Sequence, residues 1–536
     1  MAPGGAQVAR GALAGLPEAL GRIAAEGDWD ALQRVCDEHL LSVEGELATR
    51  LLDALTLVPD DELRARPRLM LSWLSVYYAA TQPDAVELRP FLRHYTELGT
   101  RLAASMDIDS ETSVATLTTV GVAAMIALRE QGRCVEAEEL GQRLSARAAQ
   151  LSPLPGVDGA WRPGWLPLQR GLTRTLMDDR PAAVELFRHA FELATLEPAT
   201  AATALNAAAN LAMIFANLGH TGSAQQWLQR MQEFEVPSQR VRYLLTAGGS
   251  IAEGWDALDR YDDTELASLL EIVGDGTRRI EVWPFAAALV FAHGLYRGDQ
   301  ASALAHLGTL RLSHAPELTE LTAASQVLRR AWIDLLIATG QGTRALRLIK
   351  ETGAHEPWLT LSTARIRFLN GEYAAVRALA SRLPWDTVTS YRDLRQLLLL
   401  KAIAASRMGD VPEARAAADL ADRLRTPDEV LSLASLSPAE RAEIQEIKEF
   451  PLTDEARERL ARARGVFPDR LDLVELTSRE HAVLTELDAG GSTPEIAGKL
   501  VVSVNTVRTQ VKSVYRKLGA STREDAVLRA YELGLL

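Results

Sequence analysis

The sequence is poor in cysteine and lacks the common motifs of enzymes and metal sites. Only Cys36 and Cys134 are cysteines among 536 residues, which excludes a disulfide framework and fits a reducing compartment. No GxxxxGK string followed by Ser or Thr occurs, so ATP hydrolysis is not expected. The nine histidines have no metal-ligand spacing, and no GxSxG elbow is present. We therefore expect a protein that is not an enzyme and that carries no cofactor and no metal ion.

Long apolar runs are absent as well. The longest uncharged stretches, 112–128 and 198–226, contain threonine, asparagine, alanine and glycine, a composition typical of packed helices rather than membrane spans. Residues 1–15 lack the apolar segment of a signal peptide. We therefore expect a soluble, cytoplasmic protein with no membrane partner.

Acidic residues outnumber basic ones overall, but one stretch near the C-terminal end has only basic charge. The chain has 58 Lys and Arg against 71 Asp and Glu, a net charge of −13. No acidic residue lies between Glu495 and Glu524, whereas six basic residues do: Lys499, Arg508, Lys512, Arg516, Lys517 and Arg523. This balance indicates that most of the chain resists non-specific contact with nucleic acid, and that any nucleic-acid contact is confined to this segment.

Helix boundaries can be identified in the C-terminal segment 476–536. Capping boxes, in which a hydroxyl residue precedes Glu by three positions, occur at 477–480, 492–495 and 521–524. Gly490, Gly491 and Gly519 stand where helices must stop, since glycine accepts positive φ without steric cost. The sequence predicts four helices, over 478–489, 494–500, 504–518 and 522–533.

The third of these helices has one apolar and one basic face. Val507, Val511, Val514 and Leu518 recur at helical spacing, which predicts a buried stripe. The opposite side carries Asn505, Arg508, Thr509, Lys512 and Arg516. A run of charge more often marks a solvated face. Here the tight turn 501–503 and the short helix before it favour a helix that enters the major groove of DNA.

The segment 476–536 resembles the DNA-binding domain of LuxR/FixJ-type bacterial transcription regulators. The pattern of that family, LTxRExxVL, GxSxxEIAxxL, SxxTVxxxxxxxxxKLG and RxxAV, is almost wholly present. The resemblance implies a double-stranded DNA partner and a homodimer that forms through the fourth helix. It implies base contacts from Arg508, Thr509 and Lys512, and phosphate contacts from Asn505, Thr506 and Lys517, with Arg516 on the same face. Gln510 departs from the family, which commonly has His there, so the resemblance does not fix the fine sequence preference.

The chain before this segment predicts an array of helical hairpins. Short turns with Gly or Asp recur at roughly 40-residue intervals, and a small residue follows most of them. They lie at Gly132, Asp179, Gly219, Asp262, Gly298, Gly340, Gly371 and Gly409. The array resembles degenerate tetratricopeptide-like repeats. The stretches 26–39 and 51–79 resemble the start of the sensor region in large LuxR regulators of the maltose-activator type, although no ATPase module precedes them here.

The expected fold is therefore all-α, an α-solenoid of helical hairpins followed by a four-helix domain with a helix-turn-helix. The sequence predicts three parts: a sensor or interaction domain over 1–425, a linker with short helices over 426–473, where the helical period weakens and prolines recur, and the DNA-binding domain over 474–536.

One loop in the array is a candidate ligand site. Trp161, Arg162 and Trp165 lie in the Pro- and Gly-rich stretch 152–167. An arginine between two aromatic side chains would form a clamp for a ligand. The same residues would equally suit a loop that two tryptophans hold against the core.

Two hypotheses follow for the function. In the first, the chain is a sequence-specific transcription regulator in which a small molecule or protein that binds the array controls the DNA-binding domain. In the second, the array is a scaffold that recruits a protein partner, and DNA binding is secondary. A stable protein partner on residues 1–425 would favour the scaffold, and a ligand-dependent change in DNA affinity would favour the regulator.

Overall fold

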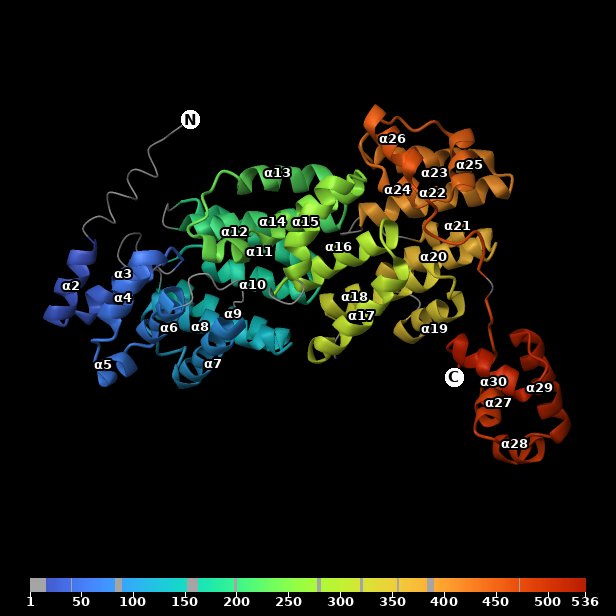
Figure 1. Cartoon of the computed structure of the whole chain (residues 1–536), viewed down its shortest axis with the longest axis horizontal. Coiled ribbons are helices and arrows are strands. Elements are labelled where there is room, and N and C mark those ends of the chain that lie inside the picture. Colours follow the sequence, from blue (N-terminus) through green and yellow to red (C-terminus); the bar gives the residue numbers. More distant parts are fainter. Residues whose placement is uncertain are drawn as a thin grey trace. The chain divides into compact units, whose positions relative to one another are not determined.

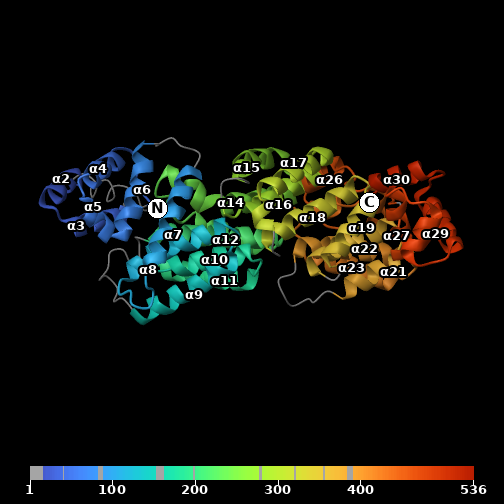
Figure 2. The same cartoon turned by 90° about the horizontal axis from the view of Figure 1, so that it is seen from below.

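The structure is a computed structural model of the chain. It describes residues 16–39, 41–81, 89–151, 162–196, 200–276, 281–318, 322–353, 356–382, 390–471 and 473–536. Within these ranges every regular element is a helix, and no strand is present (Figures 1 and 2). The all-α prediction is confirmed. None of the described helices is long and apolar enough to cross a membrane.

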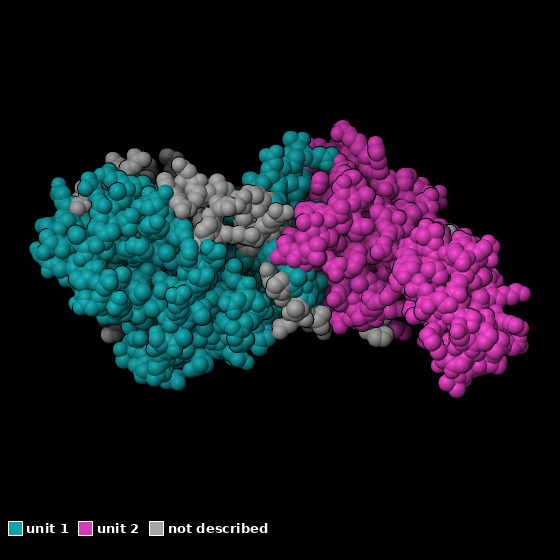
Figure 3. Space-filling view, turned by 60° about the horizontal axis from the view of Figure 1, so that its bottom comes forward, with its two compact units in different colours: residues 1–257, 263–290, 314–327 teal, residues 258–262, 291–313, 328–536 magenta. Residues whose placement is uncertain are grey.

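The chain forms two compact units, and it alternates between them (Figure 3). Unit 1 comprises residues 1–257, 263–290 and 314–327, and unit 2 comprises 258–262, 291–313 and 328–536. The division falls within three helices: α14 (Gln239–Asp259), α16 (Trp283–Tyr296) and α18 (Ala323–Ala338).

Unit 1 is a series of helices in which each packs against its neighbours along the chain. They are α2 (Leu16–Glu26), α3 (Trp29–His39), α4 (Gly45–Leu55), α5 (Asp60–Ala65), α6 (Pro67–Thr81), α7 (Arg89–Ser105), α8 (Val114–Glu130), α9 (Cys134–Leu151), α10 (Trp165–Leu176), α11 (Arg180–Ala194), α12 (Ala201–Asn217), α13 (Thr221–Met231), α15 (Asp263–Gly276) and the 3-10 helix η2 (Ala315–Leu318). The first uncharged stretch of the sequence forms most of α8, and the second covers α12 and the start of α13. The helices α8 and α12 are buried on nearly all sides. The lack of charge in these stretches fits this burial, because an unpaired charge in a packed interior is strongly disfavoured.

The helices end at the turns that the sequence predicts. Gly132, Gly219, Gly340 and Gly409 all have φ between 73° and 80°. At Gly219 the last carbonyls of α12 are bonded by the turn itself, because His220 N–H donates to Phe215 O over 2.9 Å and Gly219 N–H to Ala216 O over 2.9 Å. Such a turn needs a residue that tolerates positive φ, which is why glycine recurs there.

Buried polar side chains join the helices of unit 1. The Arg129 side chain of α8 is fully buried and forms an ion pair with Glu281, with Nε 2.8 Å from Oε1. Its other nitrogens donate to Gln169 and Thr173 of α10. A buried guanidinium needs hydrogen-bond partners for its nitrogens, since leaving the charge unpaired would strongly destabilise the fold.

Unit 2 contains the remaining helices. They are α17 (Gln300–Ser313), α19 (Gly342–Thr352), the 3-10 helix η3 (Pro357–Leu359), α20 (Thr360–Leu369), α21 (Tyr373–Ser381), α22 (Tyr391–Arg407), α23 (Val411–Arg423), α24 (Leu431–Ala434), α25 (Pro438–Ile447), α26 (Asp454–Arg462), α27 (Ser478–Asp488), α28 (Thr493–Leu500), α29 (Val504–Leu518) and α30 (Arg523–Glu532). The long helix α22 is buried along most of its length and packs against α23 and α21.

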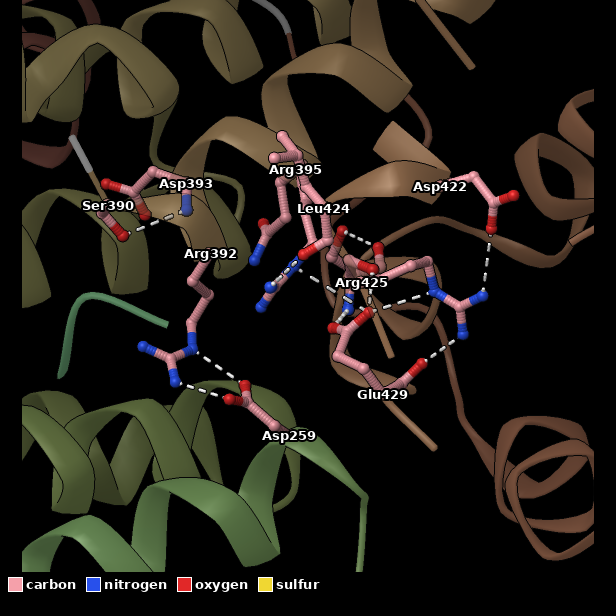
Figure 4. A network of polar contacts seen from close by, with 12 residues as sticks. Asp259, Ser390, Arg392, Asp393, Arg395, Asp422, Leu424, Arg425 and Glu429 are labelled. Carbon is pink, nitrogen blue, oxygen red and sulfur yellow. Dashed lines mark hydrogen bonds and ion pairs between the residues drawn. The ribbon is translucent and has the colours of Figure 1, made fainter. Parts of the chain in front are cut away.

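Two groups of buried ion pairs hold α22 in place (Figure 4). Arg392 of α22 donates to both carboxylate oxygens of Asp259, over 2.8 and 2.6 Å. On the next turn of α22, Arg395 donates to Leu424 O over 3.0 Å and lies 4.0 Å from Glu429, which also accepts from both the N–H and the hydroxyl of Ser432. Charge-assisted bonds of this kind fix geometry strongly because these side chains are buried.

The stretch predicted as a linker forms short helices that belong to unit 2. Leu431, Leu436 and Ile444 are fully buried. The Val430 N–H donates to Asp259 O over 2.7 Å, so this stretch is tied to a turn far away in the sequence. The stretch contains α24, α25 and α26, and its burial is a feature that the sequence pattern does not reveal.

Candidate nucleic-acid interface

The four C-terminal helices α27 to α30 occupy the predicted positions, each within one residue at either end. The caps explain this agreement. At α27 the Thr477 hydroxyl accepts from Glu480 N–H, and the Glu480 carboxylate accepts from Thr477 N–H. The predicted third capping box is wrong by one residue. The N-cap of α30 is Thr522, whose hydroxyl accepts from Asp525 N–H over 3.1 Å. The carboxylate of Asp525, not that of Glu524, accepts from the backbone before the helix, at Ser521 N–H.

Two small apolar clusters form the core of this domain. One joins α27, α29 and α30 and centres on Leu484, Val514 and Ala530. The other joins α27, α28 and α29 and centres on Val483, Ile496 and Val507. The predicted stripe of α29 is confirmed: Val507, Val514 and Leu518 are buried, and Val511 packs partly buried against the second cluster. Burial of this stripe fixes which side of α29 faces outward.

The Glu480 carboxylate locks α29 onto α27. It accepts from Ser513 Oγ and from Lys517 Nζ, each over 2.7 Å, in addition to its cap bond. Burial would raise the pKa of this carboxyl, but the hydrogen bonds from Lys517, Thr477 and Ser513 outweigh burial and lower its pKa to about 2. The carboxylate is therefore charged at neutral pH and holds α29 at a fixed orientation.

Several basic side chains of the domain are bound internally. Lys499 forms an ion pair with Glu486, and Lys517 with Glu480, each over 2.7 Å. Arg523 Nε donates to Leu487 O over 2.9 Å, at the C-terminal end of α27. These three groups serve the fold, and a helix C-terminus is a favourable place for a cation.

By contrast, three basic side chains on α29 project outward. Arg508, Lys512 and Arg516 are exposed, and within the described residues none of them has a hydrogen-bond or ion-pair partner. They are four residues apart, so they form one row along the helix with a rise of about 6 Å between successive members. We call Arg508, Lys512 and Arg516 the basic row. A row of unpaired cations on an exposed helix suits the phosphates and base edges of a duplex.

The other predicted DNA-contacting residues lie on or beside this face. Asn505 and Thr509 are exposed, and Thr509 Oγ1 donates to Asn505 O over 3.0 Å. Thr506 is half-buried beside the N-cap Ser503, with 2.8 Å between their hydroxyls. Lys517 is half-buried and bound to Glu480, so a phosphate contact there would compete with the ion pair. The roles of these residues stay predictions.

Sequence reasoning missed how α28 ends. Its C-cap is Val501, with φ 55° and ψ 49°, in the left-handed region. The helices α27 and α29 instead end near Gly490 and Gly519, with φ 89° and 68°. A β-branched residue in this region is rare, and no sequence rule would place one there.

The candidate ligand residues of the array are only partly described. Trp161 lies outside the described residues. Arg162 donates to Asp37 O over 2.6 Å, and its guanidinium lies 5.4 Å from the centre of the Trp165 ring. Burial lowers the pKa of Arg162, and Asp37 and Tyr95 act against this. Arg162 thus has an internal partner, and the clamp stays a prediction.

Comparison with known proteins identifies the C-terminal domain. Residues 474–530 match the family of bacterial regulatory proteins named luxR. These residues cover α27, α28, α29 and most of α30, so the resemblance to the LuxR-type helix-turn-helix is confirmed for this part of the chain. A domain of this family indicates DNA binding and transcriptional regulation. No solved structure matches the chain.

Proposed function

We propose that the chain is a transcription regulator that reads a specific duplex sequence through α29 and that its helical array controls this activity. The proposed division is that of the sequence: an α-solenoid sensor over 1–425, a connecting stretch over 426–473 and the DNA-binding domain over 474–536. The observation that carries the proposal is the basic row. Lys499 and Lys517 pair with carboxylates and Arg523 donates to a carbonyl, whereas Arg508, Lys512 and Arg516 form a row that is exposed and unpaired in the described structure.

The position of the row agrees with its proposed role. In a helix-turn-helix the second helix lies in the major groove, and its exposed side contacts base edges and the flanking phosphates. Arg508 stands in the first half of α29 and Lys512 near its middle, and both would contact bases, whereas Arg516 stands near its end and would contact a phosphate. Thr509, exposed beside them, would also face bases.

The double substitution Arg508→Ala plus Lys512→Ala tests the proposal. DNA recovered from a random duplex pool by the full chain would serve as the probe in a gel-shift assay. We expect the variant to lose binding at least tenfold, since each base-contacting side chain contributes about 1–3 kcal/mol. The circular dichroism spectrum should not change, because both side chains are exposed.

A charge-matched control is the pair Arg457→Ala plus Arg462→Ala. These arginines are exposed on α26 and lie outside the DNA-binding domain. The two substitutions remove the same charge as the α29 variant, and we expect DNA binding to remain as in the wild type. Full binding by the α29 variant would show that α29 is not the reading helix, and failure of the full chain to enrich any duplex would reject the proposed function.

The proposed active form is a homodimer that pairs through α30. Leu528 and Tyr531 are 62% and 54% exposed on this helix, and exposed large apolar side chains so close together favour a protein contact. Pairing would place two copies of α29 on one duplex, which raises affinity by effective concentration.

Contacts between α19 and the DNA-binding domain support control by the array. One face of α19 binds both ends of that domain. Thr343 Oγ1 accepts from Val474 N–H over 3.0 Å, Lys350 forms an ion pair with Glu475 over 3.3 Å, and Arg347 donates to Gly534 O. We call these three contacts the α19 clasp. Because Gly534 lies two residues after the end of α30, a signal that moves α19 would alter how freely α30 pairs.

A further inference from the structure

The turn between α28 and α29 exposes two apolar side chains. Val501 is 89% exposed and Val504 is 37% exposed. We call them the valine pair. Val502, which lies between them, packs instead against the cluster of Ile496 and Val507. The valine pair belongs to neither apolar cluster of the domain, so it adds little to the core.

Val501 is also in an unfavourable backbone conformation. Its φ of 55° lies in the left-handed region, where a β-branched side chain crowds its own backbone. Glycine would fit this helix end without strain, as Gly519 does at the end of α29. A strained and exposed apolar residue does not stabilise the domain, and such residues concentrate at binding sites. We therefore expect Val501 to contact a bound molecule.

The position of the pair indicates which molecule this is. Val504 is the first residue of α29 and lies four residues before Arg508, so it extends the basic row at its N-terminal end. The N-terminal residues of a recognition helix reach the base edges. In the major groove the base edges carry one apolar group, the C5-methyl of thymine. Apolar side chains at this point match that group, whereas they match neither a phosphate nor the polar edge of a G·C pair.

We propose that Val501 and Val504 contact thymine C5-methyl groups and make the protein select thymine beneath the N-terminal end of α29. The proposal rests on the proposed function, because it requires α29 to lie in the major groove. It adds two specificity-determining residues to those that the family resemblance implies. It also gives a physical reason for a valine at a helix end that favours glycine.

The test removes single methyl groups from the DNA. A duplex selected from a random pool by the full chain would be resynthesised with each thymine replaced in turn by deoxyuridine, which lacks only the methyl group. Binding would be followed by fluorescence anisotropy. We expect one or two positions in each half-site at which the replacement weakens wild-type binding about fourfold, the effect of burying one methyl-sized group. At those positions 5-methylcytosine in a G·C pair carries the same methyl group, so it should be bound more tightly than unmethylated cytosine.

Substitutions then assign the effect to the valine pair. Val501→Ala and Val504→Ala should each weaken binding to the thymine duplex, and in the double variant deoxyuridine should cause no further loss. Val411→Ala is the matched control, since Val411 is also the first residue of its helix, α23, and is 70% exposed. It should leave binding and the deoxyuridine effect as in the wild type.

A third variant separates a binding role from a folding role. Val501→Gly relieves the backbone strain, so its unfolding midpoint should not fall while its binding weakens. A lower midpoint with intact binding would show that Val501 is structural, and the proposal would be wrong. The proposal is also wrong if no position of a selected duplex is sensitive to deoxyuridine. It is equally wrong if the Val501→Ala plus Val504→Ala variant stays as sensitive to deoxyuridine as the wild type. Failure to select any duplex is a different result, which rejects the proposed function itself.

Discussion

Among single residues, Glu480 shows most directly how the fold prepares the reading helix. Its carboxylate caps α27 and binds Ser513 and Lys517 of α29. Its cap could be predicted from the sequence, because a capping box is a local pattern. Its bonds to α29 could not, since they join residues more than 30 positions apart. The same limit explains why Lys517 was predicted only as a phosphate contact.

We expect Glu480→Gln to loosen the DNA-binding domain. A neutral amide leaves Lys517 without its carboxylate, and the loss of charge-assisted hydrogen bonds should cost about 1.5–3 kcal/mol. Hydrogen exchange of the peptides that cover α27 and α29 in the full chain would measure this at pH 7. Glu486→Gln is the control, because Glu486 pairs with the exposed Lys499 and should contribute less. Equal protection in the wild type and in Glu480→Gln would contradict this role.

The pH dependence of this contribution follows from the lowered pKa of Glu480. A carboxyl whose pKa is lower in the folded state stabilises the fold above its unfolded pKa of about 4.5, and this stabilisation is lost as the pH falls toward about 2. The difference in protection between wild type and Glu480→Gln should therefore be full at pH 7, shrink below pH 4.5 and vanish near pH 2. A difference that grows as the pH falls would have the wrong sign.

At the scale of helices, the sequence predicted where elements begin and end better than how they pack. Glycine turns and capping residues act locally, so their positions could be read from the sequence. The small residue that follows a turn is buried, as close helix packing requires, at Ala183, Ala224, Ala345 and Ala414. Ala301 also follows a turn but is exposed, because burial depends on which helix lies opposite.

The approach of α14 to α12 is such a packing feature. A Cβ atom added at Gly248 of α14 would lie 2.6 Å from Ala209 O of α12. The Asn206 amide of α12 also donates to Leu244 O and Leu245 O of α14, over 3.1 and 3.0 Å. The two helices therefore approach backbone to backbone, and only glycine permits this contact at position 248.

We expect Gly248→Ala to destabilise unit 1 by about 1–3 kcal/mol, the usual effect of overpacking, since a backbone oxygen cannot move aside. Gly222→Ala is the control. A Cβ atom at Gly222 of α13 meets nothing within 4 Å, so alanine there should be neutral or stabilise by up to about 1 kcal/mol through helix propensity. Urea denaturation of both variants would measure the two effects. A stabilising Gly248→Ala would mean that the helices are further apart.

At the scale of the whole molecule, the link between array and DNA-binding domain was the least predictable feature. The sequence indicated a linker over 426–473 from its prolines and charges. The structure buries much of this stretch, and Asp259 and Arg392 in the same network are distant in the sequence. Buried ion pairs between such distant residues leave no periodic pattern, which is why composition alone indicated only a linker with short helices.

The α19 clasp leads to a prediction about control. Arg347→Ala plus Lys350→Glu removes one contact and makes the other repulsive toward Glu475. We expect the variant to bind the selected duplex more tightly than the wild type when no signal is present, because the DNA-binding domain is released. Gel-shift titration would measure the change. Arg464→Ala, an exposed arginine outside the clasp, should have no effect. Weaker or unchanged binding by the clasp variant would show that these contacts do not restrain the domain.

The alternation of the chain between its two units has a consequence for the genetics of this protein. Residues 258–262 and 291–313 belong with 328–536, and residues 263–290 and 314–327 belong with 1–257. A stop codon anywhere from codon 258 to codon 327 therefore truncates both units, and no allele ending there retains an intact half. Nonsense alleles that keep the array and lose only DNA binding should instead cluster after codon 473, at the boundary of the C-terminal domain.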